Sequence, residues 1–154
     1  MNTLSMRLAD KSDLQQLFVW RNSYAVRRFS RNSALISWAN HEVWFEAKLN
    51  TAEGGSRIYI FSESENSIGM IRLDTLSYGI AEISILVEPS LQGNGLGSRI
   101  LKQSIEHAFN RLSYFELRAS IHIENIASKK LFSKFGFVQT EKDLFISYKL
   151  SKIN

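Results

Sequence analysis

Three glycines stand close together in the middle of the chain, in the segment Gln92-Gly93-Asn94-Gly95-Leu96-Gly97. A β-rich run precedes this segment, and a run with helical periodicity follows it. Glycine permits positive φ and lets a ligand approach the main chain. The N-terminus of a helix adds free N–H groups and the positive end of a dipole. This layout predicts a pyrophosphate site, while the glycines alone fit an ordinary strand-to-helix turn equally well.

The loop differs from two common phosphate-binding motifs. It lacks the Lys-Ser/Thr ending of a P-loop, which disfavours nucleotide hydrolysis. Its spacing is G-x-G-x-G, whereas dinucleotide folds carry G-x-G-x-x-G directly after a first strand. Because the loop also lies mid-chain, a dinucleotide-binding domain is disfavoured.

Three ionisable residues near the loop could transfer protons. Glu82 lies inside the apolar run Ile80–Val87, where burial would raise the pKa of its carboxyl group and suit it to act as a base. The alternative is a solvent-facing carboxylate near the start of a strand. His122 and Glu124 end the next β-rich run and, being two residues apart, would share one face. An unpartnered histidine is more often structural.

The first third of the chain combines arginines with aromatic residues. Arg21 follows a tryptophan, and helical spacing would bring His41, Trp44 and Phe45 together. Guanidinium groups match phosphate and carboxylate oxygens, and aromatic rings can stack on sugars or bases. Solvated arginines beside core aromatics are the alternative. The residues expected on the substrate side are Arg21, Asn22, Trp38, His41 and Trp44.

These residues need strands and helices to position them. Strands are expected at Met6–Ala9, Arg57–Phe61, Ser67–Leu73, Ala81–Val87, Tyr114–Ile123 and Leu144–Leu150. Helices are expected after Ser12, after Ser37, after the glycine loop, and at Ala127–Phe135 with Gly136 as C-cap. Ser12 would form a capping box with Gln15, and Glu53–Ser56 reads as a turn. The order predicts an α/β or α+β fold, and the lack of a linker predicts one domain, 1–154.

Composition excludes several classes of protein. The chain has no cysteine, which excludes a disulfide scaffold, a thiolate nucleophile and a cysteine zinc site. The net charge of +4 comes from dispersed Lys and Arg residues, which favours small phosphorylated ligands over nucleic acid. No signal-peptide pattern and no membrane-length apolar run is present, so a cytoplasmic protein without a membrane partner is expected.

Two motifs together resemble the GNAT superfamily of N-acetyltransferases. Gln92-x-x-Gly95-x-Gly97, directly after a strand, is similar to the superfamily's acyl-CoA motif. The run Asn125–Phe137, an Asn opening a helix that ends in Gly-Phe, is similar to its second motif. The resemblance is sharp over Glu82–Phe137. It implies a GNAT-like fold with a central mixed, mostly antiparallel sheet, flanked by helices and splayed at the acyl-CoA site. It also implies acetyl-CoA as cosubstrate and no metal.

The resemblance assigns roles to individual residues. The main chain of the loop would hold the CoA pyrophosphate, through Gln92, Gly93, Asn94, Gly95, Leu96, Gly97 and Ser98. Leu86 and Val87 would pair with the pantetheine amides, and Asn125 and Ser128 would contact the pantetheine arm or the nucleotide end. For Asn125, a helix N-cap is the simpler alternative. Glu82 matches the position of the base that removes a proton from the amine.

The chain departs from the superfamily pattern at Phe132, where many members carry a tyrosine that would protonate the CoA thiolate. Phenylalanine has no proton to give. Water, Tyr78 or Tyr114 would then serve, or no acid at all, because a thiol with a pKa of ~8.5 leaves readily as thiolate.

The first third resembles GNAT enzymes that acetylate the 4-amino group of nucleotide-linked amino-deoxy sugars in pathways to pseudaminic-type acids. It is also similar, less closely, to enzymes that modify ribosomal-protein N-termini. Three hypotheses follow: an N-acetyltransferase of a nucleotide sugar, a protein or small-amine acetyltransferase, and a non-catalytic acyl-CoA-binding module. A monomer or a homodimer is expected.

Overall fold

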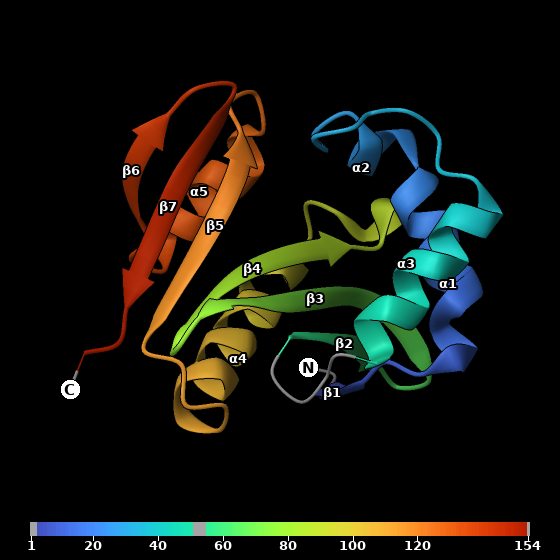
Figure 1. The fold of residues 1–154 in the computed structure, drawn as a ribbon, viewed down its shortest axis with the longest axis horizontal. Coiled ribbons are helices and arrows are strands. Elements are labelled where there is room, and N and C mark those ends of the chain that lie inside the picture. Colours follow the sequence, from blue (N-terminus) through green and yellow to red (C-terminus); the bar gives the residue numbers. More distant parts are fainter. Residues whose placement is uncertain (1–2, 51–54, 154) are drawn as a thin grey trace.

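A seven-stranded mixed sheet forms the centre of the fold (Figure 1). The computed structural model describes residues 3–50 and 55–153. The strand order is β1-β2-β3-β4-β5-β7-β6, and of these neighbours only β4 and β5 run parallel. The strands are β1 (Leu4–Leu8), β2 (Ser56–Glu63), β3 (Asn66–Ser77), β4 (Ile80–Val87), β5 (Glu116–His122), β6 (Val138–Lys142) and β7 (Phe145–Ser151).

Helices cover both faces of the sheet. They are α1 (Leu14–Asn22), α2 (Tyr24–Arg27), α3 (Trp38–Asn50), α4 (Leu96–Asn110) and α5 (Ile126–Lys134), with 3-10 turns η1 (Lys11–Asp13) and η2 (Pro89–Leu91). No helix in the described ranges is long and apolar enough to cross a membrane. The mixed, mostly antiparallel sheet flanked by helices confirms the predicted fold class.

Strand alternation divides the buried residues into two cores. On one face, residues of β2 and β3 such as Ile58, Ile60 and Met70 pack with Trp20 of α1 and Phe45 of α3. The larger core lies on the opposite face and is built around α4 and α5. Successive side chains of a strand point to opposite faces, so polar residues in phase with Met70 lie on the α1–α3 side.

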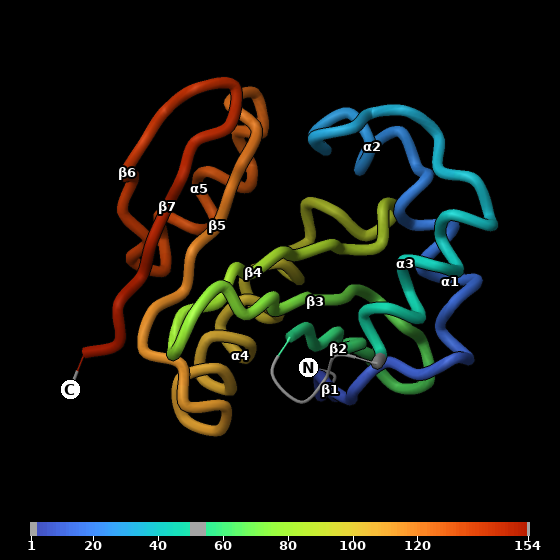
Figure 2. The backbone as a smooth tube through the Cα atoms, viewed as in Figure 1, coloured from blue at the N-terminus to red at the C-terminus, as the bar shows by residue number. Residues whose placement is uncertain are grey.

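The sheet splits between β4 and β5. Pairing is limited to Ile80 with Glu116, Ala81 with Leu117, and Glu82 with Arg118. Beyond Glu82 the strands diverge, and Figures 1 and 2 show them separating toward their carboxyl ends. The expected splay is present, and it leaves the main chain of residues 83–87 without a β5 partner.

The N-terminal cap of the first helical segment differs from the prediction. Asp10, not Ser12, is the cap residue: its side chain accepts from the Ser12 N–H at 2.8 Å, and Asp13 accepts from the Asp10 N–H at 2.9 Å. This capping box opens η1, and α1 starts at Leu14, so Gln15 takes no part in it. The η1 turn starts the helical path earlier than the apolar spacing indicated.

Two other predicted termini are confirmed. Ser37 Oγ accepts from the Asn40 N–H at 3.2 Å at the start of α3, and Gly136 ends α5 with φ +91°. Half of the expected turn at Glu53–Ser56, positions 53 and 54, lies outside the described ranges, and Ser56 already belongs to β2. Strand β6 and helix α2 were not predicted, because β6 is exposed at every residue and α2 spans one turn.

Candidate active site

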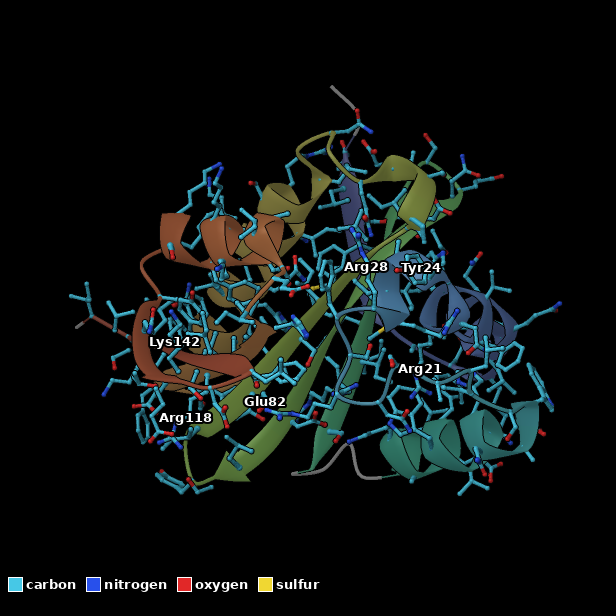
Figure 3. The ribbon with its side chains drawn as sticks, turned by 90° about the horizontal axis from the view of Figure 1, so that it is seen from above. Arg21, Tyr24, Arg28, Glu82, Arg118 and Lys142 are labelled. Atoms are coloured by element: carbon cyan, nitrogen blue, oxygen red, sulfur yellow. The ribbon has the colours of Figure 1, made fainter. Side chains whose placement is uncertain are left out.

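A cavity of about 700 Å³ occupies the split between β4 and β5. Its walls are the residues 82–87 of β4 and 119–122 of β5, the glycine loop, α5, and the residues 25–32 that follow α1. Figure 3 shows Glu82 beside Arg118 on the strand side, with Arg21 and Arg28 toward the helical side. The cavity therefore joins the predicted cofactor side to the predicted substrate side.

The glycine loop presents an open main chain. Gly93 and Gly95 have φ of +86° and +78°, and a Cβ at either position would meet no atom within 4 Å. Gly95 is the N-cap of α4, and no side chain in the described ranges caps this helix. Because the first turn of a helix has unpaired N–H groups, the loop fits an anion such as a pyrophosphate. Gln92, Gly93 and Gly97 line the cavity, whereas Asn94, Gly95, Leu96 and Ser98 lie outside its lining.

Helix α5 closes the cofactor side. Asn125 Oδ1 accepts from the Ser128 N–H at 3.2 Å, so the helix-cap interpretation of Asn125 is confirmed, and both residues also line the cavity. Phe132 is 2% exposed and packs edge-on against Phe137, with ring centroids 4.9 Å apart. At Phe132 the wall is therefore apolar and offers no phenolic hydroxyl group.

Neither tyrosine suggested as a replacement acid lines the cavity. Tyr78 lies in the β3–β4 turn and is 94% exposed. Tyr114 is buried, and its hydroxyl group shares a hydrogen bond of 2.5 Å with Thr75 Oγ1. Both residues sit near the closed end of the split, so both suggestions are wrong.

Glu82 stands where the two strands separate. It is partly buried, pairs in register with Asp74 on β3 and with Arg118 on β5, and lines the cavity. Among the described residues, none forms a hydrogen bond or an ion pair with its carboxylate. The neighbouring Arg72 is held instead by Asp74, with Nε to Oδ2 at 2.7 Å. The Glu82 carboxylate is therefore available to a ligand in the cavity.

His122, the last residue of β5, and Glu124, two residues beyond it, lie in different surroundings. His122 lines the cavity between the rings of Phe29 and Phe145, and its Nδ1 accepts from the Glu124 N–H at 3.1 Å. Glu124 is exposed and lies outside the cavity wall, because the chain turns after His122 through the bond from Asn125 N–H to His122 O at 2.9 Å. The expectation that both share a cavity-facing side is wrong for Glu124.

Arg21 and Trp44 are the two predicted substrate residues that reach the cavity. The Arg21 guanidinium lies 3.8 Å from the centroid of the Trp44 ring. Burial, and secondarily the charge of Arg72, lowers the pKa of Arg21 to about 10, so the group stays protonated at neutral pH. No ion pair to Arg21 occurs within the described part of the chain.

The other three predicted substrate residues lie outside the cavity wall. Asn22 holds the main chain of Ile36 on both sides, donating to its carbonyl at 2.9 Å and accepting from its N–H at 2.7 Å. His41 is fully buried, and Trp38 packs edge-on against Phe18 at 5.1 Å. Packing turns Asn22 and His41 toward the protein, whereas Trp38 stays 41% exposed, and none of the three lines the cavity.

Some cavity residues were missed by the sequence analysis, among them Arg31, Arg72, Ser84, Ser120 and Phe145. Arg72 could have been predicted from the sequence, because a charged residue inside the β-rich run Ser67–Leu73 is as unusual as Glu82 in its own strand. The others carried none. Arg31 donates a hydrogen bond to Ser120 Oγ, and its guanidinium carbon lies 4.3 Å from the centroid of the Phe145 ring.

The charge of the cavity is strongly positive. Among the described residues of its wall, Glu82 is the one acidic side chain. Of the wall arginines, Arg72 is the one that pairs with a carboxylate in the described part of the chain, that of Asp74. The arginines of the wall are Arg21, Arg27, Arg28, Arg31 and Arg72. No cluster that could hold a metal ion occurs in the described ranges.

The split parallel pair of strands and the glycine loop that opens a helix agree with the acyl-CoA-dependent transferase fold that the sequence motifs predict. The chain belongs to the GNAT acetyltransferases: residues 3–138 match the family described as acetyltransferase (GNAT) domain. It is an N-acetyltransferase, and acetyl-CoA is its acetyl donor.

Similar proteins carry several names. YwnH of Bacillus subtilis is 28% identical over 145 residues, covering 88% of this chain and 85% of that protein. Acetyltransferase PseH of Campylobacter jejuni is 22% identical over 134 residues, covering 87% and 82%. The structure of spermidine N-acetyltransferase from Vibrio cholerae, in complex with CoA and spermine, aligns with TM-score 0.85 at 18% identity, covering 96% and 95%. These levels of identity leave the acceptor open.

Proposed function

We propose that this enzyme transfers the acetyl group of acetyl-CoA to the 4-amino group of a nucleotide-linked amino-deoxy sugar. The observation that carries the proposal is the charge of the cavity wall. Among its described residues Glu82 is the one acidic side chain, and four of the five arginines have no carboxylate partner in the described part of the chain, the exception being Arg72. An acceptor that brings negative charge fits such a wall, because unpaired cations in a partly buried cavity gain from an anion.

The cofactor half of the cavity is assigned to acetyl-CoA. The main chain of Gln92–Ser98 holds the pyrophosphate, since its N–H groups and the dipole of α4 favour an anion. Leu86 and Val87 pair with the pantetheine amides through main-chain groups that β5 does not use. Asn125 and Ser128 contact the arm from α5.

Glu82 is assigned as the base. The amine nitrogen attacks the thioester carbonyl carbon, a C–N bond forms, and the C–S bond breaks. The amine proton passes to the Glu82 carboxylate, directly or through water, and the electron pair leaves on the CoA sulfur. Phe132 supplies no proton, so the thiolate leaves unassisted or takes a proton from water, which a thiol pKa of ~8.5 permits. His122 is the reserve candidate for the base.

Two other acceptor classes are less well supported. A polyamine such as the spermidine of the Vibrio cholerae relative would bring several positive charges beside Arg21, Arg28 and Arg31. Like charges at such short distances repel each other, and a partly buried wall screens this repulsion poorly. A protein N-terminus remains compatible with the cavity if acidic residues follow it. A non-catalytic acyl-CoA-binding module is disfavoured, because Glu82 faces the cavity free of internal partners.

The acceptor class can be tested in one assay. Purified protein and acetyl-CoA are incubated with a UDP-linked 4-amino-deoxy sugar, the same sugar without the nucleotide, spermidine, or a peptide amine. Acetylated product is detected by mass spectrometry, and thiol release is measured colorimetrically. We expect the nucleotide-linked sugar to react fastest and spermidine slowest. Preference for spermidine or the peptide would replace the proposed acceptor, and no thiol release with any amine would support the non-catalytic module.

A further inference from the structure

We infer that His41 is the positioning residue for the acceptor's anionic group: it does not touch the acceptor, and it aims the Arg21 guanidinium into the cavity through its Nδ1 atom. The inference rests on the proposed function, in which Arg21 contacts the acceptor's phosphate. It adds a role for a residue that lines no part of the cavity.

The hydrogen bonds of His41 define its tautomer. The ring is fully buried, and its Nε2 lies 2.8 Å from the carbonyl oxygen of Leu14 in α1. A carbonyl oxygen can only accept, so Nε2 carries the proton. In a neutral imidazole the other nitrogen then has a free lone pair. Nδ1 of His41 accordingly accepts from Nη1 of Arg21, at 3.0 Å.

His41 stays neutral in this setting. Burial lowers the pKa of its ring, the carbonyl of Leu14 opposes this, and the charge of Arg21 lowers it further. Arg21 is therefore oriented by a neutral acceptor. A carboxylate in the same place would neutralise the guanidinium, whereas an imidazole fixes its direction and leaves its charge for a ligand.

Two aromatic rings of α3 complete the surroundings of the Arg21–His41 pair. The guanidinium carbon of Arg21 lies over the Trp44 ring, 3.8 Å from its centroid. The His41 ring stacks beside Trp44 at 5.9 Å and Phe45 at 6.2 Å. Trp44 follows His41 by three residues, so both project from one face of α3. The same helix therefore supplies the ring beneath Arg21 and the atom that aims it.

The link between Asn22 and Ile36 keeps α3 in register with α1. Asn22 is the residue next to Arg21, and its two hydrogen bonds to the Ile36 main chain fix the start of α3. Ser37 then caps the helix. Arg21 and His41 thus meet because the ends of both helices are tied together, which explains why an Asn follows Arg21.

The test uses two variants that separate the two ring nitrogens. In His41→Asn the side-chain oxygen hangs on Cγ like Nδ1 and can still accept from Arg21. In His41→Gln the amide reaches as far as Nε2 and can still donate to Leu14, while the acceptor for Arg21 is lost. Val43→Ala, an exposed position on α3, controls for general changes in the helix.

The readout is the KM for the nucleotide-linked acceptor, measured beside kcat and the KM for acetyl-CoA. We expect His41→Gln to raise the acceptor KM about three- to tenfold, the worth of one ordinary hydrogen bond, with little change in kcat or in the KM for acetyl-CoA. His41→Asn should restore most of the wild-type KM. In the background of Arg21→Ala, His41→Gln should add nothing, because its effect passes through Arg21. An additive effect, or equal loss in both His41 variants, would overturn the inference.

A second measurement separates this inference from the proposed function. UDP binding is followed by calorimetry with CoA saturating the glycine loop, and the ¹⁵N resonances of His41 are recorded without ligand. Absence of UDP binding to the wild-type protein would count against the nucleotide-sugar acceptor and not against the positioning role of His41. A His41 ring protonated on Nδ1, or a Nδ1 resonance unchanged in Arg21→Ala, would overturn the positioning role whatever the acceptor proves to be.

Discussion

Glu82 combines a position at the split of the sheet with a carboxylate that no described residue holds. Replacement by glutamine keeps its size and removes its basicity. We expect Glu82→Gln to lower kcat about 10²–10⁴-fold, the usual worth of general-base catalysis, with CoA affinity unchanged. Steady-state kinetics and CoA calorimetry measure the two effects. Near-normal turnover would transfer the role to His122 or to water.

Arg21 offers an unpaired charge over an aromatic ring. Arg21→Ala removes a charge-assisted hydrogen bond to the proposed phosphate, which is worth roughly 1.5–3 kcal/mol, or about ten- to a hundredfold. We expect the KM for the nucleotide-linked sugar to rise by that factor and the KM for acetyl-CoA to stay constant. The same amino sugar without its nucleotide is the control substrate. Equal losses with both substrates would make Arg21 a structural residue.

At the scale of elements, the glycine loop and α4 form one unit. Gly95 has φ +78° at the helix start, and Gly136 has φ +91° at the end of α5, away from the loop. Alanine at either position costs about 1–2 kcal/mol of left-handed strain. The two alanine variants therefore carry similar backbone strain, one at the glycine loop and the other after α5.

We expect Gly95→Ala to weaken CoA binding by about tenfold or more, because its methyl group enters the open space that the phosphates would approach. Gly136→Ala should lose stability to a similar extent and bind CoA normally. Calorimetry with CoA and thermal unfolding measure both properties. Equal CoA affinity in the two folded variants would show that the loop does not hold the phosphates.

At the scale of the whole molecule, one buried and one partly buried histidine couple stability to pH. Burial first, and then Arg111 and Arg57, lowers the pKa of His107, whose Nε2 lies 3.1 Å from the Tyr59 hydroxyl group. The pKa of His41 is lowered as well, chiefly by burial. With both pKa values lowered on folding, the unfolded chain takes up protons first as pH falls.

The free energy of unfolding should therefore be steady above about pH 6.5, the ordinary histidine pKa, and decline as pH falls below it until the lowered folded pKa values are passed. His107→Gln keeps a polar group near Tyr59 and removes one titration, so its stability should fall less steeply. Urea unfolding across this pH range provides the test. Stability that increases on acidification through the same range would contradict both pKa directions.

Much of the sheet and several helix termini followed from local patterns in the sequence. Gly136 ends a helix because a left-handed residue is needed there, and Asn125 starts one because its side chain can reach the N–H three residues on. Glu82 stood out because a carboxylate interrupts an apolar strand. Such preferences act over a few residues, so they can be read without knowing the fold.

The tertiary structure alone decided which polar side chains meet. His41, predicted to contact substrate, turned inward to Leu14 and Arg21, twenty-odd residues away, and Glu124 turned out of the cavity. Arg31 reached Ser120 across 89 positions of sequence. The charge of the cavity depends on these long-range contacts, because an arginine presents its charge to a ligand only where packing leaves it facing the cavity without a carboxylate partner. The sequence pattern alone does not indicate which arginines pair with a carboxylate and which face the cavity.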